Sequence, residues 1–322
     1  MEHRELGMTR LGVSAIGLGM AAIGRPGYIN LGHEDDLAGR TDALRLESHA
    51  FDILDAARES GITYVDAARS YGKAEEFVAA WLASRRPTPG ALIVGSKWGY
   101  VYTGDWKVDA EVHETKIHTR ENLDRQRALS FNLLGDYLRL YQIHSANVES
   151  GVLEKADVIA RLSELRSGGV VIGLSTSGPR QVDTIRRALE IEIDGELLFG
   201  TVQATWNLLE TSAGDALAEA SDAGLGVIVK EAVANGRLTS RNHAVAERLS
   251  GLATGWSLDA IAIAAGLRQP WASVVLSGAA SVDQLASNLT ALDVPGEVLK
   301  QVPSLAEAPE VYWRSRGALP WR

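Results

Sequence analysis

The sequence predicts an α/β protein with a single (β/α)8 TIM barrel that spans residues 1–322 as one domain. The 322 residues are 46% hydrophobic and 23% charged, which is typical of a globular protein and allows one large domain. Short apolar runs are separated by segments of helical periodicity, as in a parallel sheet that is covered on both faces. Eight such units favour a closed barrel, and an open doubly wound sheet is the alternative.

Each strand is predicted from a short aliphatic or β-branched run, and each helix from apolar residues that recur every three or four positions. We expect the strands at 15–19, 62–65, 92–97, 138–143, 170–174, 200–204, 226–230 and 273–276. We expect the helices at 42–60, 74–84, 119–134, 154–167, 179–190, 213–223, 243–252, 257–267 and 281–291. A short hairpin precedes the barrel within residues 1–14, and a polar tail follows it. Residues 24–40 and 98–112 show no helical period and are predicted as long loops at the carboxyl-terminal face of the barrel.

Charge and composition exclude several classes of protein. The net charge of −9 and the pI near 5.4 argue against a broad nucleic-acid-binding face. The absence of cysteine excludes disulfides and thiol nucleophiles, so redox chemistry would need a bound cofactor. No signal peptide is evident, and no apolar run approaches the ~20 residues of a membrane span. We therefore expect a cytoplasmic protein without nucleic-acid or membrane partners, and the oligomeric state stays open.

Four reactive side chains lie at or just beyond the ends of three consecutive predicted strands. Asp66 follows the second strand, Tyr71 comes in the turn behind it, Lys97 ends the third strand, and His144 follows the fourth. Each has an ordinary interpretation by itself, such as a helix N-cap for Asp66 or a core residue for Tyr71. The carboxyl ends of barrel strands meet on one face, where the chemistry of such barrels takes place. Together, the four residues therefore predict an active site.

These four side chains are suited to the protonation of an alkoxide. A tyrosine with its ordinary pKa near 10 is a weak acid at neutral pH. A nearby ammonium would favour the phenolate and lower that pKa by ~1–3 units, and an aspartate beside the lysine would keep the lysine charged and directed. A neutral histidine can donate a hydrogen bond to a substrate carbonyl. Such a tyrosine could protonate the oxygen as a hydride reaches the carbon.

Three segments carry a resemblance to a known family. They are Val65-Asp66-Ala67-Ala68-Arg69-Ser70-Tyr71-Gly72, Gly95-Ser96-Lys97 and Tyr141-Gln142-Ile143-His144. The first is similar to the D-T-A-x-x-Y-G segment of the aldo-keto reductases, and the others to the strand ends that carry the lysine and the histidine of that family. The resemblance covers nearly the whole chain. It implies that Tyr71 is the general acid/base, that Lys97 and Asp66 tune it, and that His144 orients the carbonyl.

The same resemblance implies a set of cofactor-binding residues. Ile172-Gly173-Leu174-Ser175 resembles the strand that holds the nicotinamide carboxamide, and residues 203–207 resemble Q-x-x-Y-N, with Trp206 in place of the stacking tyrosine. Residues 277–288 resemble the pyrophosphate and adenosine site, where a turn before a helix offers N–H groups to phosphate. Lys230 stays open between a phosphate contact and a pair with Glu231. The implied set is Met20, Asp66, Ser175, Gln203, Trp206, Lys230, Gly278, Ser281, Gln284 and Asn288.

The resemblance implies an NAD(P)H-dependent oxidoreductase that reduces an aldehyde or ketone to an alcohol, or catalyses the reverse, with this small molecule as its partner. NADP is the expected cofactor. NAD is the alternative, because residues 277–288 carry no Arg or Lys to bind the adenosine 2′-phosphate of NADP. No metal is expected, since His and carboxylate ligands do not cluster at strand ends. A barrel that binds the cofactor but serves as a regulatory subunit is the rival function.

Overall fold

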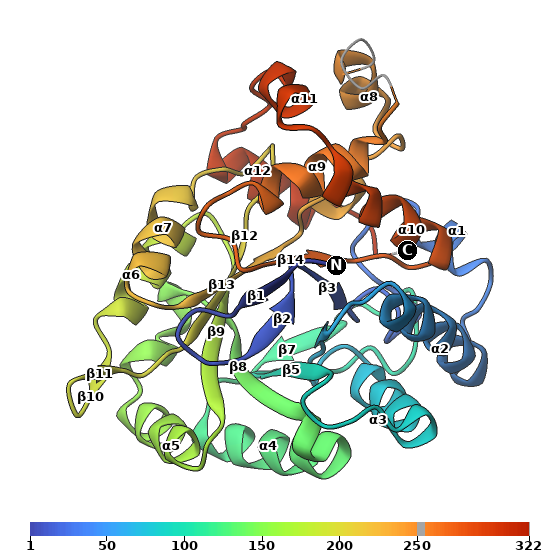
Figure 1. Ribbon diagram of the computed structural model, residues 1–322. Coiled ribbons are helices and arrows are strands. Elements are labelled where there is room, and N and C mark those ends of the chain that lie inside the picture. The colour runs from blue at the N-terminus through green and yellow to red at the C-terminus, as the bar shows by residue number, and fades with distance from the viewer. Residues whose placement is uncertain (250–254, 322) are drawn as a thin grey trace.

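A closed barrel of eight parallel strands forms the centre of the computed structural model, which describes residues 1–249 and 255–321 (Figure 1). The strands close in the order β12-β13-β14-β3-β4-β5-β8-β9, so that barrel strands consecutive in the chain are neighbours in the sheet. They are β3 (Ile16–Gly19), β4 (Tyr64–Asp66), β5 (Ile93–Trp98), β8 (Leu138–Ala146), β9 (Val171–Thr176), β12 (Thr201–Thr205), β13 (Gly226–Lys230) and β14 (Val274–Ser277). The predicted (β/α)8 fold is confirmed.

The helices that connect these strands surround the barrel (Figure 1). They are α2 (Ala43–Glu59), α3 (Ala74–Arg85), α4 (Arg120–Leu134), α5 (Ala156–Ser167), α6 (Gln181–Leu189), α7 (Gly214–Asp222), α9 (Leu258–Leu267) and α10 (Val282–Leu289). The start of α2 shows why the local sequence is helical: the Asp42 side chain accepts a hydrogen bond from the backbone N–H of Arg45, and an apolar stripe that includes Leu46 and Ile53 is buried. The helix predicted at 243–252 begins as α8 (His243–Leu249), and its residues 250–252 lie outside the described residues.

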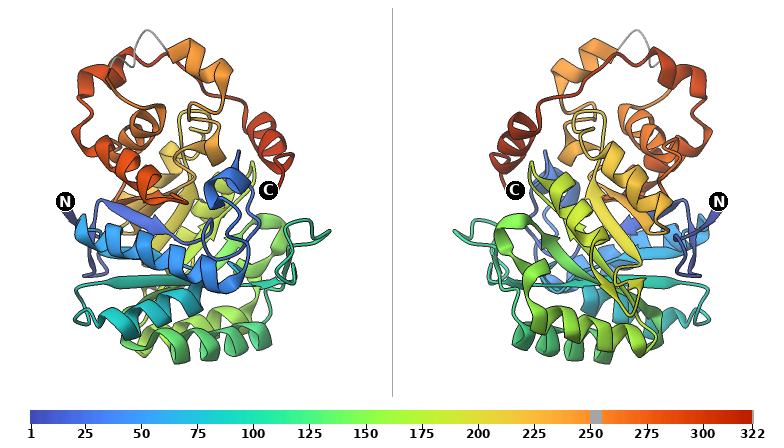
Figure 2. Two further views of the ribbon diagram at one scale, coloured as in Figure 1. Left: turned by 90° about the vertical axis from the view of Figure 1, so that its right-hand side faces the viewer. Right: turned by 90° about the vertical axis from the view of Figure 1, so that its left-hand side faces the viewer.

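The predicted N-terminal hairpin closes one end of the barrel. Strand β1 (His3–Glu5) pairs antiparallel with β2 (Gly12–Ser14). Leu6, Leu11 and Val13 from this hairpin share a buried cluster with residues inside the barrel such as Tyr64 and Ile228. Figure 2 shows the N-terminus on one side of the barrel and α12 with the C-terminus on the other. The hairpin therefore covers the amino-terminal end of the barrel, and the cavity described below lies at the carboxyl-terminal end.

Four segments contain secondary structure where loops or a tail were expected. Residues 24–40 contain α1 (His33–Leu37), and β6 (Tyr100–Tyr102) in the second loop pairs with β7 (Glu114–Lys116). The tail forms α11 (Gly296–Gln301) and α12 (Pro309–Gly317), and β10 (Glu192–Ile193) pairs with β11 (Glu196–Leu197). The 3-10 turns are η1 (Gly135–Tyr137), η2 (Val148–Ser150), η3 (Val152–Glu154), η4 (Ala234–Gly236) and η5 (Thr290–Asp293). Apart from α12, these elements are too short for a periodic pattern to reveal them.

Candidate active site

The structure brings the four predicted reactive residues together at the carboxyl-terminal ends of three adjacent strands. Asp66 is the last residue of β4, Lys97 the last but one of β5, and His144 lies near the end of β8. Tyr71 follows β4 in the turn before α3. These strands are neighbours in the barrel, in the order β4-β5-β8. Because parallel strands end on the same face, side chains far apart in sequence face one space here.

An ion pair between Lys97 and Asp66 forms the floor of this site. Both side chains are buried, and the ammonium donates to one carboxylate oxygen of Asp66 and, at 2.9 Å, to the Ala67 carbonyl. The other carboxylate oxygen accepts from the Tyr64 hydroxyl at 3.1 Å and from the Gln203 amide at 2.8 Å. Buried charges are tolerated when they are paired and hydrogen-bonded. These contacts fix the direction of the ammonium.

The Tyr71 hydroxyl lies above this ion pair, 3.4 Å from Lys97 Nζ. Burial raises the pKa of Tyr71 well above its usual value, and the charges of Asp66 and Glu114 add to this effect, while Arg25 opposes it. The expected lowering of this pKa is therefore wrong, because the desolvation of a phenolate outweighs the effect of nearby positive charge. The hydroxyl keeps its proton at neutral pH and is available as a proton donor.

The His144 ring lies beside Tyr71 and lines the same cavity. The ring centres of His144 and Tyr71 are 5.3 Å apart in an edge-to-face contact, and Tyr100 flanks the imidazole with its ring centre at 5.0 Å. Burial, together with nearby cations, lowers the pKa of His144 well below its usual value, so the imidazole is neutral at pH 7. Its Nδ1 lies 3.3 Å from the Ser70 hydroxyl. With Ser70 as the donor, the ring proton is assigned to Nε2.

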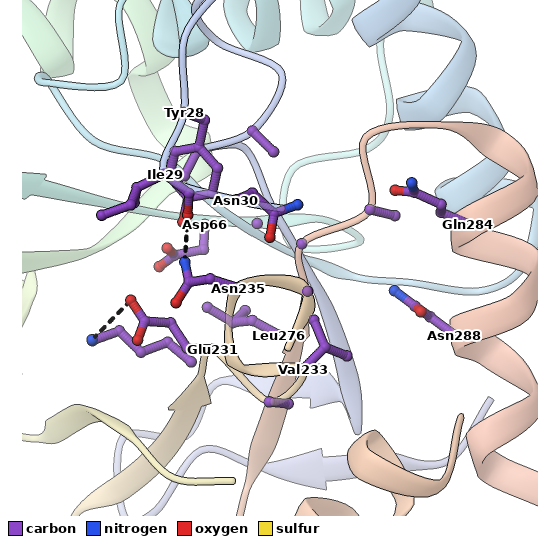
Figure 3. A pocket seen from close by; sticks show the side chains of 18 of the residues that line it. Tyr28, Ile29, Asn30, Asp66, Glu231, Val233, Asn235, Leu276, Gln284 and Asn288 are labelled. Atoms are coloured by element: carbon purple, nitrogen blue, oxygen red, sulfur yellow. Dashed lines mark hydrogen bonds and ion pairs between the residues drawn. The ribbon is translucent and has the colours of Figure 1, made fainter. Parts of the chain in front are cut away.

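A cavity of about 460 Å³ extends from these residues to α10, a volume typical of sites for small molecules. Seven of the predicted cofactor-binding residues line it: Asp66, Ser175, Gln203, Lys230, Gly278, Gln284 and Asn288. Figure 3 shows Gln284 and Asn288 extending from α10 on the side of the cavity opposite Asp66 and Glu231. The cavity therefore joins the predicted catalytic residues to the segment that resembles an adenosine site.

Three other predicted cofactor-binding residues do not line this cavity. Met20 is fully buried in the core. Trp206 packs edge-to-face on Trp271, with 5.7 Å between the ring centres, because the chain has already left the barrel beyond the end of β12. Ser281 caps α10, where its hydroxyl accepts from the backbone N–H of Gln284 at 3.2 Å. The structure thus places Trp206 against Trp271, and its role as a stacking residue stays a prediction.

Lys230 lies at the end of β13 in the wall of the cavity. Its ammonium donates to the Thr205 hydroxyl at 2.6 Å and lies 3.9 Å from a carboxylate oxygen of Glu231. Burial lowers the pKa of Lys230 to about 8. Burial disfavours the charged form of Glu231. The positive charges of Arg316 and Lys230 outweigh this effect and lower the pKa of the Glu231 carboxyl to about 2. Lys230 therefore pairs with Glu231 and also lines the cavity, so both alternatives from the sequence keep structural support.

Several residues that line the cavity lacked a recognisable sequence signal. Arg25 and Tyr28 come from the loop after β3, Glu114 from β7, and Arg316 from α12. Trp321 from the tail also lines the cavity. None of the other four belongs to a motif or follows a barrel strand directly. Only the folded chain brings them to the predicted active site.

A second polar cluster lies at the α10 end of the cavity. The Arg241 guanidinium donates to both carboxylate oxygens of Asp36, at 2.8 Å for the Nη1–Oδ2 contact, and to the Leu31 carbonyl at 2.6 Å. The Gln284 amide donates to the same carboxylate at 2.6 Å. Nearby, the Asn235 amide donates to the Ile29 carbonyl at 2.8 Å (Figure 3). These bonds connect the loop after β3 to the loop after β13 and to α10.

Within residues 1–249 and 255–321, every helix is too short or too polar to cross a membrane. The same residues contain no group of three or more His, Asp or Glu side chains arranged to hold a metal ion.

Comparisons with known proteins identify relatives along most of the chain. The uncharacterised oxidoreductase YqkF of Bacillus subtilis is 24% identical, with 90% of this chain and 91% of the relative aligned. The B. subtilis aldo-keto reductase YhdN is 26% identical over 95% and 94% of the two chains. The NADH-specific methylglyoxal reductase of Escherichia coli is 26% identical over 74% of this chain and 69% of that protein.

Solved structures and a family model complete the comparison. The holo form of the aldo-keto reductase AKR11C1 from Bacillus halodurans superimposes with a TM-score of 0.74 at 23% identity, covering 96% of this chain and 97% of the other. The PA4992 protein, a putative aldo-keto reductase of Pseudomonas aeruginosa, gives a TM-score of 0.65 at 22% identity, over 90% and 94% of the two chains. The model of the Aldo/keto reductase family matches residues 16–307. The chain is therefore a member of the aldo-keto reductase family.

Proposed function

We propose that the protein is an NAD(P)H-dependent carbonyl reductase in which Tyr71 donates a proton to the carbonyl oxygen. One observation carries this proposal. The Tyr71 hydroxyl lies 3.4 Å from the ammonium of the buried Lys97 and lines a cavity together with the neutral ring of His144. A cofactor-binding subunit without turnover would have no use for a buried ammonium beside a phenol, so the arrangement favours catalysis over a regulatory role.

Aldo-keto reductases use a nicotinamide cofactor, and residues along this cavity fit such a group. A Cβ atom built on Gly278 would meet nothing within 4 Å, so the backbone before α10 is open to a ligand. Gly278 and Asn288 at the α10 end would hold the phosphate and adenosine part, where the positive end of the helix favours an anion. Ser175 and Gln203 would hold the carboxamide near the catalytic residues. When bound, the cofactor supplies the hydride.

Residues of the chain orient the substrate and transfer the proton. His144 donates a hydrogen bond from Nε2 to the carbonyl oxygen of the substrate and orients it. Tyr71 gives its proton to that oxygen as the carbon accepts the hydride, so the carbonyl becomes an alcohol. The Lys97 ammonium stabilises the phenolate that forms, and Asp66 holds the ammonium in place. A phenol that stays protonated at neutral pH suits the reducing direction.

Tyr71→Phe tests this function by removing one oxygen atom. General acid catalysis contributes about 10²–10⁴-fold, so kcat for the reduction of a neutral aldehyde should fall by that factor while cofactor affinity stays within a few-fold. Tyr137→Phe is the matched control, because that hydroxyl bonds to the Pro87 carbonyl away from the cavity. A Tyr71→Phe enzyme with nearly normal turnover would remove Tyr71 from the mechanism. No turnover of any aldehyde by the wild type, with cofactor bound, would favour the regulatory role.

We further propose that the protein binds both cofactors, with a weak preference for NADPH. Residues 277–288 contain no cation for a 2′-phosphate, but Arg241 lines the α10 end of the cavity. A guanidinium can bind a phosphate bidentately. Asp36 already occupies this guanidinium and would repel a 2′-phosphate, which weakens the preference.

A further inference from the structure

Arg25 is buried in the wall of the cavity, beside the proposed proton donor. It lies in the loop after β3, lines the cavity and is only 2% exposed. Its guanidinium carbon lies 4.8 Å from the ring centre of Trp321, 5.7 Å from that of Tyr71, and 5.9 Å from those of Tyr28 and Tyr102. Aromatic rings stabilise a cation near their faces. The position therefore holds a guanidinium cation beside the Tyr71 ring.

The hydrogen bonds of Arg25 leave part of its guanidinium without a partner. Nη1 donates to the Ser70 carbonyl at 2.9 Å and to Glu114 Oε2 at 3.0 Å. The buried Nε has no hydrogen-bond partner among residues 1–249 and 255–321. A buried donor without a partner is unfavourable, and the N–H groups of a guanidinium form a fork that matches a carboxylate. Because Arg25 lines the cavity, a carboxylate bound there would lie against this guanidinium.

The other charges at this end of the cavity also favour an anion. Asp66 is paired with Lys97, Glu114 with Arg25, and Glu231 with Arg316. Lys230, which shares Glu231 with Arg316, adds a further cation to these three balanced pairs and lines the same cavity. An excess of positive charge in a cleft with low-dielectric walls attracts anionic ligands.

We propose that the substrate is a short carbonyl compound that also carries a carboxylate, which Arg25 binds while Tyr71 protonates the carbonyl oxygen. This inference deepens the proposed carbonyl reduction and rests on it. Because the guanidinium carbon lies 5.7 Å from the centre of the Tyr71 ring, a few bonds between the two groups of the substrate are enough. Semialdehyde acids and 2-oxo acids have this chemistry.

The test compares matched pairs of substrates with and without a carboxylate. The pairs are succinic semialdehyde with butanal, and glyoxylate with acetaldehyde, each assayed for kcat/KM with a saturating reduced cofactor. A hydrogen bond to a charged group is worth about 1.5–3 kcal/mol, so the wild type should prefer the acid in at least one pair by about 10–100-fold. Arg25→Met keeps an unbranched apolar side chain among the rings but removes the charge. It should abolish the preference, mainly by raising KM for the acid.

Two further variants keep the test independent of whether Arg25→Met folds. Glu114→Gln removes the carboxylate that competes for Nη1 and should increase the preference for the acid. Arg127→Met is the matched control, because Arg127 also lies over a ring, 4.8 Å from the centre of Phe131, but outside the cavity. It should leave the ratio of acid to neutral kcat/KM unchanged.

Each outcome bears on one of the two proposals. Equal kcat/KM for acid and neutral substrates in the wild type would overturn the carboxylate site and leave carbonyl reduction intact. A preference that persists in folded Arg25→Met, or that does not rise in Glu114→Gln, would also overturn it. No turnover of any of the four compounds would count against carbonyl reduction itself.

Discussion

Replacing Lys97 with methionine is the sharpest test of how the buried ion pair assists Tyr71. The variant keeps the length of the side chain but removes the ammonium that lies 3.4 Å from the Tyr71 hydroxyl. In reduction, Tyr71 gives up its proton, so a negative charge develops on the phenol oxygen. The ammonium stabilises this charge, and its loss should slow the proton transfer rather than weaken cofactor binding.

The size of the effect follows from the distance. At 3.4 Å, an ammonium and a full phenolate charge attract each other by about 5 kcal/mol with an effective dielectric constant of 20. The carboxylate of Asp66 contacts the same ammonium and opposes the phenolate. If it cancels half of the attraction, about 2.5 kcal/mol remains. At 1.4 kcal/mol per factor of ten, kcat should fall by about 10²-fold.

The assay must separate chemistry from folding, because Lys97→Met leaves the Asp66 charge buried without its cation. Breaking a buried pair costs about 3–5 kcal/mol of stability. The double variant Asp66→Asn/Lys97→Met removes the unpaired charge, so its free energy of unfolding should recover while kcat stays low. Lys73→Met is the control, since Lys73 is half-exposed and lies over the Trp106 ring outside the cavity. A single or double variant that turns over at nearly the wild-type rate would refute the reasoning.

Three more predictions concern Ser70, the ionisation of Tyr71, and the pair of Asp36 with Arg241. Ser70→Ala removes the 3.3 Å contact that sets the tautomer of the His144 imidazole. The kcat/KM of a neutral aldehyde should therefore fall about 2–10-fold, which corresponds to 0.5–1.5 kcal/mol per neutral hydrogen bond. An unchanged kcat/KM would contradict the assigned tautomer. Burial raises the pKa of Tyr71, so the phenol retains its proton to higher pH than a free tyrosine and kcat for reduction should not fall through its ionisation between pH 7 and 9. A fall centred below pH 9 that persists in Lys230→Gln would oppose this. Asp36→Asn frees the guanidinium of Arg241, so the ratio of NADPH to NADH affinity should rise about 10-fold, whereas Arg241→Met should lower this ratio. Equal ratios in a fluorescence titration of the wild type and both variants would exclude this cluster as a determinant of cofactor preference.

The barrel and its four reactive residues could be predicted because both depend on local patterns. The apolar run at 62–65 identifies a strand by itself, and the abrupt change to Asp66 marks its end. In a parallel barrel, the carboxyl ends of all strands, which lead into the helices, lie on the same face. The positions of Lys97 and His144 beside Asp66 and Tyr71 therefore followed from the fold class without any knowledge of long-range contacts.

Tertiary structure alone decided which other residues reach the site. Asp36 and Arg241 are 205 residues apart in sequence, and no local pattern relates them. Trp206 matched a motif, but packing against Trp271 places it outside the cavity. Tyr71 shows the same limit in its pKa, because the sequence identified the nearby lysine and burial determined the direction of the shift. Periodicity fixes the elements, whereas burial and contacts between distant segments exist only once the chain has folded.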